Sequence, residues 1–246
     1  MNEFILPSLF FVVSFIYSSV GLGGGSAYTA LMIIFGIDYK TMPIISLILN
    51  IFVSFIGTIN FWRYGHGRLN LVIPFLITSI PMTLIGGILD VPEDIFYYIL
   101  LISLVIIATK IYFFNSTTIS FKVEGFQKWI FIFFMGGFLG FLAGTVGIGG
   151  GIYLVPTIFI FGLGTEKEAA AAGIVFIFVN SIVGLIPRIQ FQVFNFKVIV
   201  PLIIAVMIGG FLGSYFGSKK FKPDTTEKVI GIVLLIGIYS LIGKII

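Results

Sequence analysis

The stretch SSVGLGGGSAY, residues 18–28, lies inside a long apolar run, and a close copy, GTVGIGGGIYL, follows at residues 144–154. Glycine is one of the worst residues with which to continue a helix. It accepts positive φ angles and lets other groups approach the backbone closely. Two such clusters in apolar surroundings predict that a helix is interrupted inside a hydrophobic segment at each of them.

The composition indicates a membrane protein. Hydrophobic residues make up 59% of the 246 residues and charged residues 10%, with a mean hydropathy of +1.18, whereas a soluble domain carries about 25% charged residues. A transmembrane helix needs about 20 mostly apolar residues, so this length allows roughly eight crossings. We predict an all-α, polytopic, multi-pass protein of the cell membrane with no room for a soluble catalytic domain.

Several classes of function are excluded by what the chain lacks. It has no cysteine, which removes disulfides and thiolate metal sites. Its net charge of +4 comes from basic residues between hydrophobic segments, where they set orientation, so we expect no nucleic-acid partner. The ten carboxylates all fall in loops or at block ends, whereas a membrane metalloenzyme needs a His/Asp/Glu cluster at mid-depth. We expect a transporter rather than an enzyme, with no cofactor and no metal.

Polar residues divide the chain into two sets of four hydrophobic blocks, and the two sets resemble each other. The blocks cover about residues 4–37, 41–62, 69–89, 95–114, 127–164, 169–187, 196–217 and 228–246. VGLGGG (20–25) matches VGIGGG (146–151), and VSFIG (53–57) matches NSIVG (180–184), at shifts of 126 and 127. We predict two transmembrane repeats, 1–114 and 127–246, joined by a loop at 115–126. Internal repeats are common in transporters, whose substrate sites lie where the repeats meet.

The opening block of each set is too long for one ordinary crossing. Residues 4–37 would span about 50 Å as one helix, against a hydrocarbon core of about 30 Å. We predict that each opening block forms two helical pieces joined at its glycine cluster, as a hairpin that enters the membrane and returns.

The distribution of lysine and arginine supports this hairpin. If each opening block crossed once, the two sides would hold eight and six basic residues; if each block turns back, they hold ten and four. The positive-inside rule then places the ten in the cytoplasm and both termini outside. Each repeat has an odd net number of crossings, so the two repeats are inverted.

Helices that begin at the glycine clusters would present unpaired N–H groups and the positive end of a helix dipole, which together form a ready anion site. Close packing of helices through small residues is the alternative for the same glycines. The predicted substrate-binding glycines are Gly21, Gly23, Gly24, Gly25, Gly147, Gly149, Gly150 and Gly151.

The repeated VGxGGG in a duplicated membrane protein of this length resembles the TauE/SafE sulfite exporter family, also called the toluene sulfonate uptake permease family. The resemblance covers essentially the whole chain and is best in the second copy, which contains Pro156; Ala30 stands at the corresponding place in the first copy. The resemblance implies transport of sulfur-containing anions such as sulfite, sulfoacetate or other organosulfonates.

Polar side chains within or beside the hydrophobic blocks are the remaining candidates. We predict substrate contacts for Ser26, Asn50, Tyr153, Asn180, Ser181 and Arg188. For the asparagines, hydrogen bonding between helices is an equal alternative, and serine can bond to its own helix backbone. For Arg188, which lies near a block end, extension of the side chain to the membrane interface is the alternative. His66, the sole histidine, is expected in a solvated loop.

The sequence therefore predicts a membrane transporter that exports a small sulfur-containing anion held at the broken helices. The expected partners are the anion and the lipid bilayer, and a homodimer is one assembly to test. An anion channel and a noncatalytic membrane subunit are the competing functions, because a channel can share repeats and broken helices.

Overall fold

The computed structural model describes residues 5–113, 125–189, 196–219, 235 and 237–243. Over these residues the chain is helical and contains no strand, as expected for an all-α membrane protein. The labelled helices are α1 (Ile5–Ser19), α2 (Gly25–Ile34), α3 (Met42–Arg63), α4 (Leu69–Ile88), α5 (Glu93–Phe113), α6 (Gly125–Val146), α7 (Gly151–Ile160), α8 (Glu166–Leu185) and α9 (Phe196–Lys219). Within these ranges, α3, α4, α6, α8 and residues 199–219 of α9 are long and apolar enough to cross a membrane.

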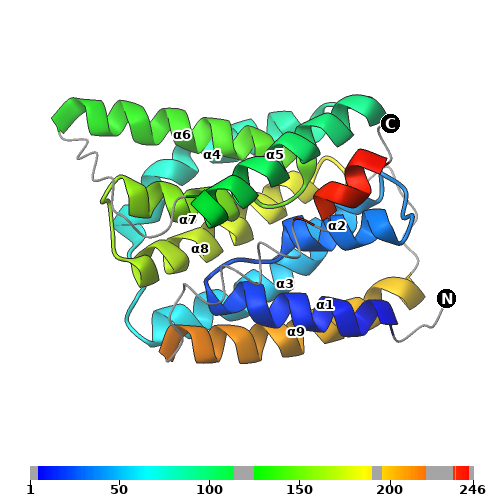
Figure 1. Ribbon diagram of the computed structural model, residues 1–246. Coiled ribbons are helices and arrows are strands. Elements are labelled where there is room, and N and C mark those ends of the chain that lie inside the picture. The colour runs from blue at the N-terminus through cyan, green and yellow to red at the C-terminus, as the bar shows by residue number, and fades with distance from the viewer. Residues whose placement is uncertain (1–4, 114–124, 190–195, 220–234, 236, 244–246) are drawn as a thin grey trace.

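Each opening block is broken at its glycine cluster, as predicted. After α1, the Leu22 N–H donates to the Tyr17 carbonyl over 2.9 Å while Gly21 takes a φ of 78°, which is the glycine-dependent end of a helix. The chain then turns back, and α2 starts after Gly24, whose φ is 99° (Figure 1). Glycine alone adopts these angles at low cost.

The second glycine cluster breaks α6 from α7 in a related but not identical way. Gly147 has a φ of 76° and donates its N–H to the Ala143 carbonyl over 3.0 Å. Gly149 also has a positive φ, 79°, whereas the corresponding Gly23 does not. α7 then starts after Gly150, whose φ is 72°. The two loops share their position in the chain but differ in backbone path.

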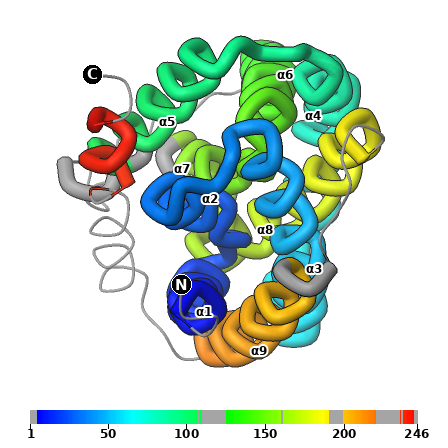
Figure 2. The backbone as a smooth tube through the Cα atoms, turned by 90° about the vertical axis from the view of Figure 1, so that its right-hand side faces the viewer, coloured from blue at the N-terminus to red at the C-terminus, as the bar shows by residue number. Residues whose placement is uncertain are grey.

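Helices of the first half pack on helices of the second. α1 lies along α9 and α6 along α4, while α3 packs against α8; α2 packs on α3 and α7 on α8. Figure 2, viewed from one end of the bundle, shows α2 and α7 near its centre and α5 at its outside. If α1–α4 are matched in order with α6–α9, exchanging matched helices turns the α1–α9 pair into α6–α4 and the α2–α3 pair into α7–α8, and leaves α3–α8 unchanged. Duplicated halves would produce this arrangement, and the repeats themselves, with their boundaries at 1–114, 115–126 and 127–246, stay a prediction.

Glycines at four-residue spacing let the helices of two pairs, α4 with α6 and α1 with α9, approach closely. On α6, a methyl group added at Gly140 would lie 2.5 Å from the Ser79 backbone of α4, and one added at Gly144 would lie 2.2 Å from the Thr83 carbonyl. On α9, methyl groups at Gly213 and Gly217 would lie 2.1 Å and 1.9 Å from carbonyl oxygens of α1. Small residues at this spacing are typical of tightly packed membrane helices.

Three basic side chains at helix ends, Arg68, Lys167 and Lys40, lie at the ends of the bundle where the hairpin arrangement predicts them. The α3–α4 turn, the start of α8 and the end of α9 meet at one end of the bundle (Figure 1), where Arg68 contacts Glu168 and Lys167 donates to the Ser218 carbonyl. At the opposite end, Lys40 lies 3.8 Å from Asp90. Lys122, Lys220, Lys222, Lys228 and Lys244 lie outside the described residues. Which end faces the cytoplasm stays a prediction.

His66 is more enclosed than expected. It lies in the α3–α4 turn, but its Nε2 is 3.0 Å from the Ser218 carbonyl oxygen, and its ring meets the edge of Phe61. The turn is therefore fastened to the end of α9 instead of standing free in solvent.

Candidate functional site at the two glycine loops

The two glycine loops touch each other at the centre of the bundle. A methyl group added at Gly25, the first residue of α2, would lie 2.8 Å from the carbonyl oxygen of Ile148 in the second loop. Gly173 of α8 lies against both clusters, because a methyl group there would be 3.6 Å from the Gly21 carbonyl and 3.5 Å from that of Gly151. Gly25 and Ile148, 123 positions apart in the chain, thus meet in one site.

Asn50 of α3 lies between these loops. The side chain is fully buried, and within the part of the chain that the structure describes neither Oδ1 nor Nδ2 has a hydrogen-bond partner. Methyl groups added at Gly23 and Gly25 would lie 2.6 Å from Oδ1 and 2.5 Å from Nδ2, and one added at Gly149 would lie 3.2 Å from Nδ2. A buried amide without partners costs about 1–3 kcal/mol per unsatisfied group, so this side chain is suited to a ligand that supplies them.

Both short helices present bare N-termini to this region. The N-cap residues Gly24 and Gly150 have no side chain, and no side-chain hydrogen bond caps either helix. The first N–H groups of a helix have no partner within it, and the helix dipole makes that end positive. Gly25 and Gly151 therefore open the helices with N–H groups that no side chain of their own covers.

Two hydroxyl groups lie close to the loops. Ser181 of α8 is fully buried with an unpaired Oγ, and a methyl group added at Gly149 would lie 3.1 Å from that oxygen. Ser26, the second residue of α2, is also buried, and its hydroxyl faces that of Tyr17. Ser181 thus joins Asn50 at the second loop, whereas Ser26 faces α1.

The remaining predicted glycines frame the loops. Gly21 lies against Ala170 and Gly151 against Ile177, both on α8. Gly24 lies against the ring of Tyr28, Gly147 against Pro43 and Gly150 against Ala143. The structure therefore places all eight glycines in or beside the two loops, with Gly23, Gly25 and Gly149 at the Asn50 amide.

Asn180 differs from Asn50, although both are fully buried. Its Oδ1 accepts hydrogen bonds from Ser79 at 3.0 Å and Thr83 at 2.8 Å, and its Nδ2 donates to the Phe176 carbonyl at 3.0 Å. Asn180 thus joins α8 to α4. This is the helix-to-helix alternative raised by the sequence, and it leaves the amide little capacity for a ligand.

Arg188 lies just beyond α8 and reaches the end of α6. Its guanidinium donates to the Thr145 carbonyl over 3.1 Å and to the Gly184 carbonyl over 3.2 Å. A cation suits the C-terminal end of a helix because the dipole there is negative. Burial lowers the pKa of Arg188 to about 10, so the group remains protonated at neutral pH. Arg188 holds the helix that leads into the second loop and does not reach the Asn50 amide.

Tyr153 lines an apolar cavity of about 670 Å³ between α5, α6 and α7. Ile102, Leu139 and Phe161 also line it, and the Tyr153 hydroxyl lies near Ser103. The cavity is lined in part by α5, which stands at the outside of the bundle (Figure 2). Tyr153 therefore belongs to this cavity and not to the group around Asn50.

The sequence interpretation named Asn180 and Ser181 of α8 but missed three other residues of this helix. Ala170, Gly173 and Ile177 each contact a glycine loop. Two features of the sequence could have indicated these contacts. One is the run of small residues AAAAG at 169–173, and the other is the position of Ile177, which corresponds to Asn50 at the shift of 127. One half thus contributes an amide to the site where the other contributes an alkyl group.

Comparisons with known proteins agree with this architecture. The family model for the sulfite exporter TauE/SafE matches residues 6–241. The chain belongs to the TauE/SafE family. A probable membrane transporter protein, y4hK of Sinorhizobium fredii, is 28% identical over 94% of both chains. The probable membrane transporter protein YunE of Bacillus subtilis is 31% identical over 40% of this chain and 36% of its own length. No solved structure matches the chain. The protein is thus a membrane transporter of this family.

Proposed function

We propose that this protein exports a small sulfur-containing anion, such as sulfite or an organosulfonate including sulfoacetate, across the cell membrane. The anion would lie between the two glycine loops, against the N-termini of α2 and α7 and the Asn50 side chain. The family supports the choice of anion, since its model carries the sulfite exporter description.

The observation that carries this proposal is the unpaired, fully buried amide of Asn50 between two uncapped helix N-termini. Such N–H groups bind oxyanions without any cationic side chain. Glycine at positions 23, 25 and 149 lets the loop backbone lie directly beside the amide, with the side chains of Ile177 and Ser181 next to it.

Burial of the site favours a carrier over a channel. Asn50, Ser181 and the loop glycines are all buried, so an anion can enter or leave only after helices move apart. A carrier alternates between such occluded and open states, whereas a conducting channel needs a continuous opening. Export of an anion from a negative interior would gain about 2.3 kcal/mol per charge for each 100 mV.

Flux measurements on purified protein in liposomes test this function. We expect saturable uptake of radiolabelled sulfite that shows counterflow and responds to a potassium potential clamped with valinomycin. An ohmic current would instead identify an anion channel, and absence of flux together with a copurifying protein would identify a membrane subunit. Flux that ignores the voltage and follows a proton or sodium gradient would show ion-coupled transport in place of a uniporter.

A further inference from the structure

We infer that the site selects a singly charged sulfur oxyanion that carries its own hydrogen-bond donor, such as hydrogensulfite or a sulfonate with a hydroxyl group. This inference rests on the proposed function and narrows its set of substrates. It sets aside dianions such as sulfate and the ionised form of sulfoacetate.

The donor requirement follows from the chemistry of the Asn50 amide. Its Nδ2 only donates and its Oδ1 only accepts hydrogen bonds, and both atoms are buried without a partner. Anionic oxygens can accept hydrogen bonds from Nδ2 and from the helix N–H groups. An anionic oxygen next to Oδ1 would be repelled, because neither oxygen carries a proton to donate. A hydroxyl on the ligand can donate to Oδ1. Rotating the amide by half a turn exchanges the two atoms and leaves the requirement unchanged.

At Asn180, the protein itself supplies the hydrogen-bond donors for the amide oxygen. Two hydroxyl groups, from Ser79 and Thr83, donate to its Oδ1. At Asn50 the corresponding space is occupied by the loop around Gly23, which has no side chain. Among the described residues none donates to Oδ1 of Asn50, so a hydroxyl group on the ligand can supply the missing donor.

The limit on charge follows from the neighbours of the loops. The groups against Gly23, Gly25, Gly149 and Gly151 are amide, hydroxyl, alkyl and backbone atoms, all uncharged. The nearby guanidinium of Arg188 is engaged with the carbonyls of Thr145 and Gly184. Partial charges at two helix ends suit one negative charge, whereas a second buried charge without a counterion is strongly disfavoured.

Ligand pairs matched in charge and size test the donor requirement on the intact protein. Isethionate and propanesulfonate differ by a terminal hydroxyl in place of a methyl group, and binding of each is measured by calorimetry on protein in lipid nanodiscs. We expect the wild type to bind isethionate about tenfold more tightly, the equivalent of one hydrogen bond to a buried group. Sulfite should bind more weakly above the pH at which hydrogensulfite loses its proton, while propanesulfonate binding stays constant, and sulfate should bind at least about tenfold more weakly than isethionate.

Variants on α3 assign the effect to Asn50. Asn50→Leu should remove the preference for isethionate. Asn60→Leu changes another buried asparagine of the same helix, which is hydrogen-bonded to Ser214 at 2.8 Å. This variant should keep the preference for isethionate. Equal binding of the two sulfonates by the wild type, tight sulfate binding, a preference retained in Asn50→Leu, or a preference lost in Asn60→Leu would overturn the inference. If the wild type binds none of these anions, the proposed function fails and this inference with it.

Discussion

Gly25 is the residue at which one added methyl group would disturb the site most directly. In Gly25→Ala the new Cβ would lie 2.5 Å from Asn50 Nδ2 and 2.8 Å from the Ile148 carbonyl. We expect sulfite flux to fall at least about tenfold, with a loss of about 1–3 kcal/mol in stability from overpacking. Gly137→Ala is the matched control, because its nearest neighbour would lie at 3.5 Å. If sulfite flux is unchanged in Gly25→Ala, the first loop is not part of the binding site.

Asn180 provides a prediction that separates packing from binding. In Asn180→Leu, Ser79 would lose the acceptor for its hydroxyl, while the single hydroxyl proton of Thr83 would still have the Gly140 carbonyl as an acceptor at 2.8 Å. The free energy of unfolding should drop by about 1–3 kcal/mol, measured by denaturation in detergent, and the preference for isethionate over propanesulfonate should persist. Normal stability with lost anion binding would instead place Asn180 among the substrate ligands.

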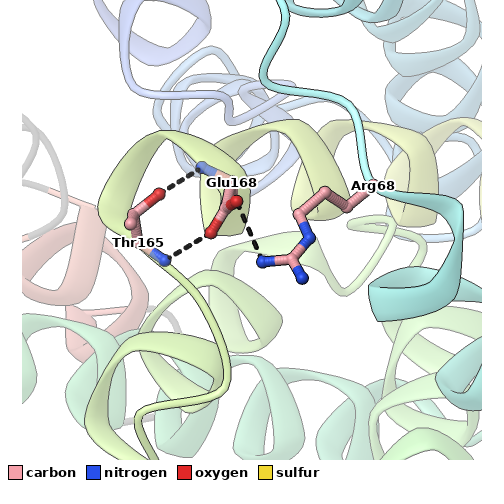
Figure 3. Close-up of polar contacts among 3 residues, drawn as sticks. All are labelled: Arg68, Thr165 and Glu168. Atoms are coloured by element: carbon pink, nitrogen blue, oxygen red, sulfur yellow. Dashed lines mark hydrogen bonds and ion pairs between the residues drawn. The ribbon is translucent and has the colours of Figure 1, made fainter.

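At the scale of single helices, the start of α8 is held by a capping box. The Glu168 N–H donates to the Thr165 hydroxyl over 3.4 Å, and the Thr165 N–H donates to the Glu168 carboxylate over 2.8 Å (Figure 3). Arg68, at the start of α4, contacts the same carboxylate at 3.0 Å. Figure 3 shows the three side chains in one chain of contacts that ties α4 to α8.

The cap should contribute more to stability than the ion pair. Thr165→Ala should lower the free energy of unfolding by about 1 kcal/mol. Arg68→Gln should lower the free energy of unfolding by less than that, since the Arg68 side chain is 57% exposed. The loss should become smaller as salt is added. Thermal unfolding of both variants at low and high salt compares them. A larger, salt-independent cost for Arg68→Gln would show that the ion pair dominates this contact.

The broken helices could be predicted from the sequence because their cause is local. Glycine with positive φ at Gly24 and Gly150 ends or starts a helix whatever surrounds it, and the length of the apolar blocks required a break. The distinction between Asn50 and Asn180 could not be predicted, because it depends on whether hydroxyl groups from another helix reach each amide. Ser79 and Thr83 precede Asn180 by 101 and 97 residues, and no local pattern reports such a contact.

For the whole molecule, the hairpin prediction places ten basic residues at one end and four at the other, which gives an expected orientation. The chain has no cysteine, so single cysteines can be introduced without background. A thiol at Arg63→Cys, an exposed position at the end of α3, should react with a membrane-impermeant reagent only after the cells are opened. One at Lys40→Cys, at the opposite end, should react in intact cells. The reverse pattern would invert the predicted topology.

The central claim is that an oxyanion lies between the two glycine loops, and anomalous diffraction can locate it directly. Hydrogenselenite has the charge, shape and hydroxyl group of hydrogensulfite and carries an anomalous scatterer. Crystals grown with selenite at a concentration that competes fully with sulfite flux should show a selenium peak within hydrogen-bonding reach of Asn50 Nδ2 and the first N–H groups of α2 or α7. A peak confined to the apolar cavity beside Tyr153, or an empty space at Asn50 under those conditions, would contradict the account.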